Sequence, residues 1–118
     1  MGDKKQTGNY GEDLATQYLK KHGYKILERN YKNKLGEIDI LARQKSAIVV
    51  VEVKTKSGSE FGSGFEMVNY FKQRKLVLLA KSLQTIYPRQ TIRIDVISVD
   101  TSTSPPKISH FENAVEEH

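Results

Sequence analysis

The chain has 118 residues, with 19 Lys or Arg against 14 Asp or Glu, a formal net charge of +5 and a pI near 9.4. This length predicts a single domain over residues 1–118 that buries a core without disulfides, and the absence of cysteine excludes a disulfide framework and a thiolate metal site. No apolar run approaches the length of a membrane span and the first ten residues are polar, so we expect a cytoplasmic protein with no membrane partner.

The first half of the chain predicts one helix followed by three strands. Asn9 is placed to cap a helix that runs to about Lys21, because apolar residues recur at helical spacing and Gly23 supplies a stop signal. The segments "YKILERNYK", "EIDILAR" and "AIVVVEVKT" each favour a strand. The turns between them are short, which predicts an antiparallel meander.

The second half predicts a loop, a long helix and two further strands. Residues 56–66 are rich in Gly and Ser and predict a mobile loop, in which residues 57–64 could close over a bound nucleic acid. A helical pattern over residues 67–87 ends before Pro88, and "TIRIDVISVD" favours a strand reached by a right-handed parallel crossover. "KISHFENAV" adds a short edge strand. The expected fold is α/β, a mixed sheet flanked by helices.

Charged side chains interrupt the second and third predicted strands. Because side chains alternate across a strand, Glu52 and Lys54 face one side of the third strand. Glu37 and Asp39 likewise face one side of the second strand, opposite its isoleucines at positions 38 and 40. A register that brings Asp39 beside Glu52 would place two carboxylates together, but the sequence does not fix that register.

Two neighbouring carboxylates offer an oxygen-rich site for Mg²⁺ or Mn²⁺, and a nearby lysine can orient water or stabilise a negative transition state. This set of groups suits phosphodiester hydrolysis. The alternative is an exposed Glu-x-Lys ion pair, which contributes little to stability. Burial favours the functional interpretation, because "IVVVEVK" is typical of a central strand, where acids are costly unless they are paired or bind metal.

Several motifs resemble known families. Asp39 followed after twelve residues by "EVK" resembles the signature of the restriction-endonuclease-like, or PD-(D/E)-x-K, nuclease superfamily. In order, "GEDLA", "ERNYK", "GEIDILA", "VVVEVKTKS", "IRIDVISV" and "HFENAV" resemble motifs of the YraN-like family of uncharacterised small bacterial proteins. The likeness covers about residues 8–115. It implies a restriction-endonuclease-like core and a Mg²⁺- or Mn²⁺-dependent nuclease that acts on DNA.

The resemblance also implies roles for individual residues of the two strands. Asp39 and Glu52 match the metal-binding acids, and Lys54 matches the catalytic lysine. The backbone carbonyl of Val53 is a further metal ligand in such sites. Glu37 belongs to the "GEID" motif and would lie beside the metal-binding acids without binding the metal itself.

The two helices carry further matches. Glu12 resembles the helix glutamate that joins the metal site in archaeal Holliday-junction resolvases; alternatively, it is a first-turn acid favoured by the helix dipole. Gln73, beside Lys72, matches a polar helix position of the superfamily, with a solvated helix face as the alternative. The chain departs from these patterns in two places: Ile38 replaces the proline before Asp39, and "VNYF" precedes Lys72 where the family more often has a small polar residue and a proline.

Other residues carry weaker signals. Candidates for contact with nucleic-acid phosphates are Lys32, Lys34, Lys56 and Lys72. Tyr10 and Tyr31 are weaker candidates for base stacking. The three histidines, at positions 22, 110 and 118, have no spacing typical of metal ligands. Asp95 has no assigned role and either faces the site or pairs with Arg93.

Three functions remain open from the sequence. The first is a nuclease for branched or single-stranded DNA, and cutting a junction would require a homodimer. The second is a nucleic-acid-binding module that keeps the nuclease fold without turnover. The third is a protein-interaction domain, which predicts that Glu52 and Lys54 are exposed.

Overall fold

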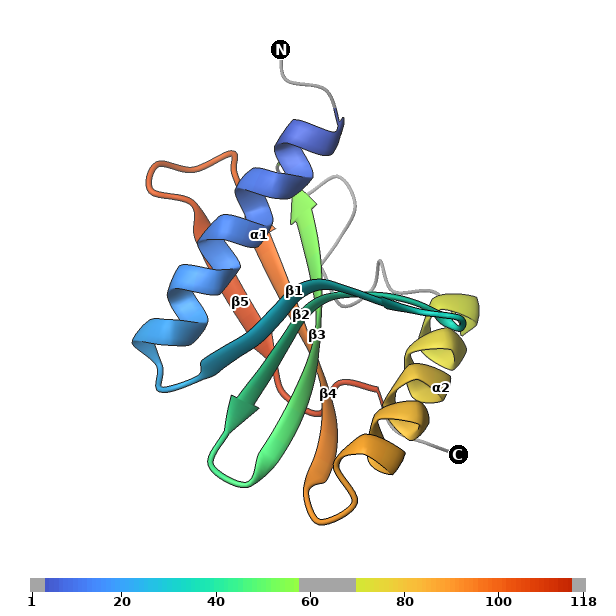
Figure 1. Cartoon of the computed structure of the whole chain (residues 1–118). Helices are drawn as coiled ribbons and strands as arrows, with labels where there is room; N and C mark the ends of the chain where they lie inside the picture. Colours follow the sequence, from blue (N-terminus) through green and yellow to red (C-terminus); the bar gives the residue numbers. More distant parts are fainter. Residues whose placement is uncertain (1–3, 58–69, 116–118) are drawn as a thin grey trace.

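The computed structural model describes residues 4–57 and 70–115, which form one mixed sheet with a helix on each face (Figure 1). In chain order the elements are α1 (Lys4–Lys21), β1 (Lys25–Asn33), β2 (Gly36–Gln44), β3 (Ala47–Lys56), α2 (Tyr70–Ile86), β4 (Thr91–Asp100) and β5 (Lys107–Phe111). The strands lie in the order β1-β2-β3-β4-β5. All neighbours are antiparallel except β3 and β4, which are parallel and joined through α2. The predicted fold class is confirmed.

Each face of the sheet packs against one helix. On β3, Val49 and Val51 lie in an apolar cluster with α1, whereas Ile48 and Val50 lie in a second cluster with α2. This alternation buries β3 on both faces, as its apolar sequence predicts. Among the described helices, neither combines the length and apolarity needed to span a membrane.

The first helix begins earlier than predicted. It starts at Lys4, so Asn9 lies inside α1 and does not cap it. Gly and Asn each lower helix propensity by at most about 1 kcal/mol, which does not stop a helix that the neighbouring residues favour. Glu12 is therefore about two turns from the helix start, beyond the reach of the N-terminal dipole. The predicted loop at 57–64 and the predicted helix start at 67–69 fall, apart from Ser57, outside the described residues.

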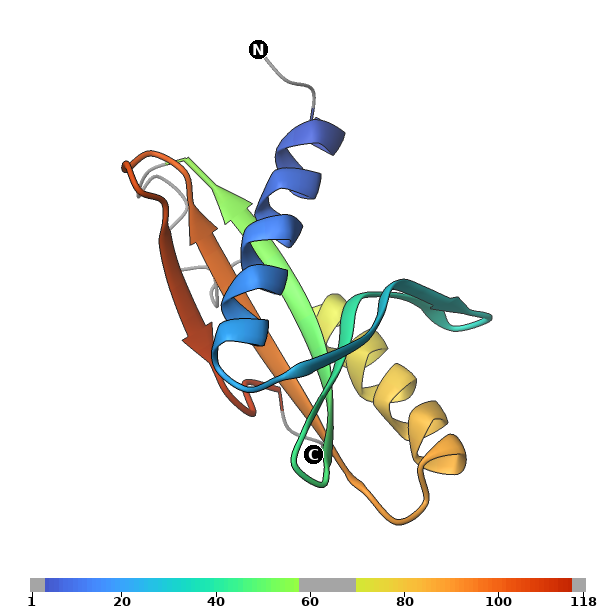
Figure 2. The ribbon, with the colours of Figure 1, turned by 60° about the vertical axis from the view of Figure 1, so that its left-hand side comes forward.

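The second strand has a partner on both sides along only part of its length. β2 pairs with β1 from Gly36 to Arg43, but with β3 only from Ile40 onward. Ile38 consequently packs in the α2 cluster and Ile40 in the α1 cluster, so the prediction that both share one face is wrong. A strand that twists away from its neighbour no longer keeps a fixed face. In Figure 2 the β1–β2 hairpin curls away from the other three strands.

Candidate active site

The hairpin register brings Asp39 and Glu52 together. Ile40 pairs with Val51, and beyond this pair β2 departs from β3. Asp39 occupies the opening, where its Oδ2 accepts a hydrogen bond of 2.8 Å from the backbone N–H of Val53. The departure of β2 therefore lets a carboxylate take the place of a strand carbonyl beside Glu52.

Glu52 is buried on the α2 face of the sheet, with 3 % of its surface exposed. Its Oε1 lies 3.4 Å from Lys54 Nζ and 3.5 Å from Lys72 Nζ, a residue in the first turn of α2. Its Oε2 is buried and accepts no hydrogen bond from the described residues. The interaction-domain alternative predicted an exposed Glu52, and the burial of this residue argues against it.

Three carboxyl groups near this point have raised pKa values. Burial raises the pKa of Glu52, and the charge of Asp39 raises it further against the two lysines. Burial also raises the pKa of Asp39, which the Val53 N–H, Lys72 and Lys54 offset only in part. Burial and the charge of Asp39 raise the pKa of Glu12. The neighbouring cations therefore offset only part of the effect of burial on these three carboxyl groups.

Glu12 reaches this region from α1. Its side chain is 15 % exposed, its Oε1 is 3.8 Å from Arg29 Nη2, and that oxygen accepts no hydrogen bond from the described residues. Gly11 permits the close approach of the helix, because a Cβ at this position would collide with Thr55 Oγ1 on β3. Absence of a side chain at position 11 thus places Glu12 near Asp39.

The donor set suits a hard cation held by few protein ligands. In the described part of the chain, no three His, Cys, Asp or Glu side chains lie in position to hold one ion together. Mg²⁺ commonly keeps several waters and binds through one or two carboxylates. Asp39 and Glu52, with one buried oxygen of Glu52 lacking a partner, fit such an ion; Glu12 stands as an additional nearby charge.

The other predicted residues lie around this centre. Glu37 is exposed, and its charge raises the pKa of both Asp39 and Glu12. Gln73 is half-buried on α2. Lys56 follows Lys54 by two residues on β3 and therefore faces the same side of the sheet.

The hairpin turn carries the remaining lysines. Lys32 and Lys34 line a cavity of about 380 Å³ together with Lys75 of α2. Of the two tyrosines considered for stacking, Tyr10 is exposed on α1, but Tyr31 is half-buried against the α2 cluster and belongs to the rim of the core.

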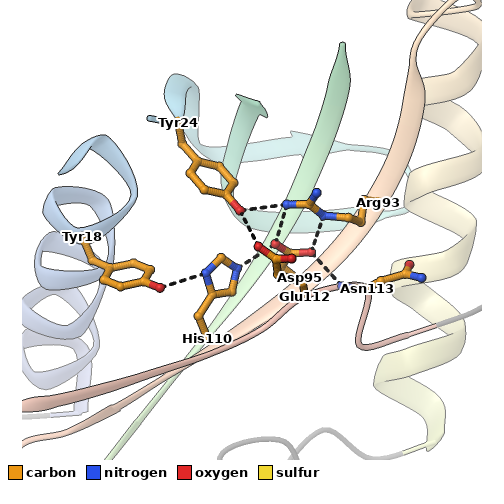
Figure 3. Close-up of polar contacts among 7 residues, drawn as sticks. All are labelled: Tyr18, Tyr24, Arg93, Asp95, His110, Glu112 and Asn113. Carbon is orange, nitrogen blue, oxygen red and sulfur yellow. Dashed lines mark hydrogen bonds and ion pairs between the residues drawn. The ribbon is translucent and has the colours of Figure 1, made fainter. Parts of the chain in front are cut away.

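Asp95 lies on the opposite face from Glu52. It pairs in register with Val51, whose side chain packs against α1, and it is fully buried. It accepts hydrogen bonds from Arg93 Nε (2.9 Å) and Nη2 (3.0 Å) and from the backbone N–H of Asn113 (3.0 Å), and His110 Nε2 is 2.7 Å away (Figure 3). The predicted alternative of pairing with Arg93 is therefore correct.

This Asp95 cluster extends to α1 and the start of β1. The Tyr18 hydroxyl is 3.2 Å from His110 Nδ1, and the Tyr24 hydroxyl accepts from Arg93 at 2.8 Å and donates to Glu112 at 3.2 Å (Figure 3). Sequence reasoning missed the cluster because residues that contact each other in it are up to 92 positions apart. The sole signal was an acid within the apolar run "IRIDVISV".

The Asp95 cluster is satisfied within itself. Burial alone would raise the pKa of Asp95, but hydrogen bonds from His110, Arg93 and Asn113 hold it below its ordinary value. It joins α1, β4 and β5 on the face away from Asp39 and Glu52. We interpret it as a structural connection.

Comparison with known proteins finds similarity to one family along most of the chain. The model of "Uncharacterised protein family UPF0102" matches residues 11–99, a range that includes Asp39, Glu52 and Lys54. A UPF0102 protein of Caldanaerobacter subterraneus is 42 % identical over 117 residues, covering 95 % of this chain and 96 % of the relative. UPF0102 proteins of Geobacter metallireducens (45 % identical; 95 % and 93 % covered) and Alkaliphilus oremlandii (44 %; 93 % and 97 %) are similar over the same extent.

Proposed function

The chain belongs to the uncharacterised protein family UPF0102, and we propose that it is a Mg²⁺- or Mn²⁺-dependent nuclease that hydrolyses phosphodiester bonds in DNA. The observation that carries this proposal is the pair of neighbouring, largely buried carboxyl groups of Asp39 and Glu52. Both carboxyl groups have raised pKa values, and one oxygen of Glu52 is buried without a described partner. Perturbed carboxylates of this kind gather at functional sites.

Two side chains would bind the cation, and a third would stabilise negative charge on the reacting groups. Asp39, held in place by the Val53 N–H, and Glu52 would hold the cation, with the Val53 carbonyl as a third ligand. A bound Mg²⁺ or Mn²⁺ supplies a water of lowered pKa and offsets charge on the phosphate. Lys54, whose side chain is 26 % exposed, can donate to the attacking water or to a phosphate oxygen.

The cations beyond the centre favour a polyanionic substrate. Lys32, Lys34 and Lys75 surround the hairpin cavity, and Lys72 and Lys56 lie on the α2 side of the sheet. We propose branched or single-stranded DNA as the substrate, in the cytoplasm. Cleavage of both strands of a junction would require two copies of the site, hence a homodimer.

A nucleic-acid-binding module without turnover is the second candidate. It is favoured by the two lysines within 3.5 Å of Glu52 Oε1, because two ammonium groups can balance two carboxylates without a metal. The two candidates differ in whether a divalent cation is needed.

One experiment separates them. Supercoiled, single-stranded and four-way-junction DNA are incubated with the protein in Mg²⁺, Mn²⁺ or EDTA, using wild type, Asp39→Asn, Glu52→Gln and Lys54→Ala. The exposed acid Glu28, on β1, provides the control Glu28→Gln. We expect cleavage that needs the metal, disappears in the three site variants and persists in the control. Cleavage that survives the site variants would refute the assigned centre, and binding without cleavage would support the second candidate.

A further inference from the structure

The first turn of α2 exposes two aromatic side chains beside the candidate site. Tyr70 is 63 % exposed and Phe71 is 81 % exposed. The next residue, Lys72, is the lysine whose Nζ lies 3.5 Å from Glu52. Neither ring belongs to the apolar clusters formed by the described residues. A large apolar side chain left this open at a charged site is informative, whereas a single exposed leucine would not be.

The two rings are arranged unequally. Arg74 donates a hydrogen bond of 3.1 Å to the Tyr70 hydroxyl, and its guanidinium carbon lies 5.8 Å from the centre of that ring. Tyr70 and Phe71 meet edge to face, with ring centres 5.8 Å apart and an interplanar angle of 70°. Tyr70 is thus held by a cation and supports Phe71 from the side. Phe71 is the ring left available to a ligand.

The residues around Phe71 favour a ligand that carries both aromatic rings and negative charge. Lys75 lies one turn after Phe71 on the same side of α2, and it lines the hairpin cavity with Lys32 and Lys34. A row of cations therefore leads from Phe71 to the hairpin. Phosphates fit the cations and bases fit the ring, but the bases of an intact duplex stack on one another and are closed to a side chain.

We propose that Phe71 is a stacking platform for an unpaired base of single-stranded nucleic acid, next to the phosphate that would lie at the cation of Asp39 and Glu52. The inference rests on the proposed function for the identity of that phosphate. It restricts the substrate to strands whose bases are free, including the open arms of branched DNA. It also gives a role to the two aromatic residues that precede Lys72.

The test measures binding rather than cleavage. Fluorescence anisotropy in EDTA compares an oligothymidylate with an abasic oligonucleotide of equal length and charge, and an oligouridylate distinguishes RNA from DNA. The proteins are wild type, Phe71→Ala, Phe71→Trp and the control Ile86→Ala, which removes an exposed aliphatic side chain at the far end of α2. Stacking on one base predicts that Phe71→Ala weakens binding of the oligothymidylate by about 5- to 150-fold. Binding of the abasic strand should not change, and Phe71→Trp should bind normally.

Three results would overturn the inference. Equal weakening on both strands would make Phe71 a packing residue, and no weakening would leave it without a role in binding. A wild-type dimer that Phe71→Ala dissociates would assign the rings to a contact between copies. The result is independent of the nuclease proposal: base-dependent binding without metal-dependent cleavage would refute the nuclease and keep the platform. Cleavage that needs Asp39, without base-dependent binding, would support the nuclease and refute the stacking platform.

Discussion

Asp39→Asn is the change that best separates a metal site from an ion-pair network. Asn keeps an oxygen for the Val53 N–H, so the 2.8 Å hydrogen bond can persist while the charge is removed. Burial raises the pKa of Asp39 despite that bond and the two lysines, so the metal-free fold disfavours the charged carboxylate relative to the unfolded chain. Without metal at pH 7, we expect the variant to be at least as stable as wild type.

Metal should reverse this order. A cation that binds only the folded state, at about a hundredfold above its Kd, stabilises the wild type by about 2.7 kcal/mol. For a chain of this size, that free energy raises the unfolding midpoint by about 10 °C. Asp39→Asn should gain much less, because it lacks one of the two carboxylates that hold the ion. Compared with wild type, Asp39→Asn would then lose no stability without metal but would gain less stability when metal is added.

Thermal unfolding followed by circular dichroism, in EDTA, Mg²⁺ or Mn²⁺, measures both quantities without relying on activity. Glu28→Gln should behave as wild type in all three conditions. An equal metal-induced shift in wild type and Asp39→Asn would locate the ion elsewhere. Without metal, the variant could instead be several kcal/mol less stable than wild type, which is the loss expected when a buried ion pair is broken. That result would show that Asp39 is a structural counter-ion of the two lysines.

Asp95→Asn should lower the free energy of unfolding by about 3–5 kcal/mol in denaturant titrations, because Arg93 loses its charged partner in a buried cluster; a loss below about 1 kcal/mol would contradict the structural role. The pKa of Asp95 is held below its usual value, so its contribution is complete above the unfolded pKa of about 4 and is lost as pH falls through the folded pKa. The unfolding midpoint of wild type should therefore fall more steeply in acid than that of Asp95→Asn. Gly11→Ala should cost about 1–3 kcal/mol through collision with Thr55, and adding Thr55→Ala should restore most of that loss; no recovery would contradict the proposed contact.

The parts of the fold set by local pattern were predictable. The apolar run from Ile48 to Val51 predicts a strand buried on both faces, as the structure has it. The short connections on either side of β2 predict the observed antiparallel meander. Prediction failed where a local signal competes with its surroundings. Asn9 favours a helix start, yet α1 continues through it from Lys4, because capping preference is weaker than continuation of the helix.

The candidate site was predictable only in its residue types. Alternation correctly gave Glu52 and Lys54 a common face, because β3 stays paired in register with β4 from Ala47 to Lys56. It failed for Ile38 and Ile40, because β2 leaves β3 at Asp39 and twists. Because β2 departs here, the backbone N–H of Val53 can donate to the Asp39 carboxylate. The alternation of side chains along a strand does not predict this contact.

The two buried acids of the central strands show how function and structure can be told apart in this chain. Asp95 and Glu52 occupy adjacent strands and are both almost fully buried. Asp95 is surrounded by donors, and they hold its pKa low despite burial. Glu52 meets a second carboxylate, retains a buried oxygen without a described partner and has a raised pKa despite two lysines. A purely structural acid gains nothing from such an arrangement, since an unsatisfied buried group costs stability. The proposed cation would account for all three features of Glu52 at once, and this asymmetry between two similar residues is why we propose the α2 face of the sheet as the place of the chemistry.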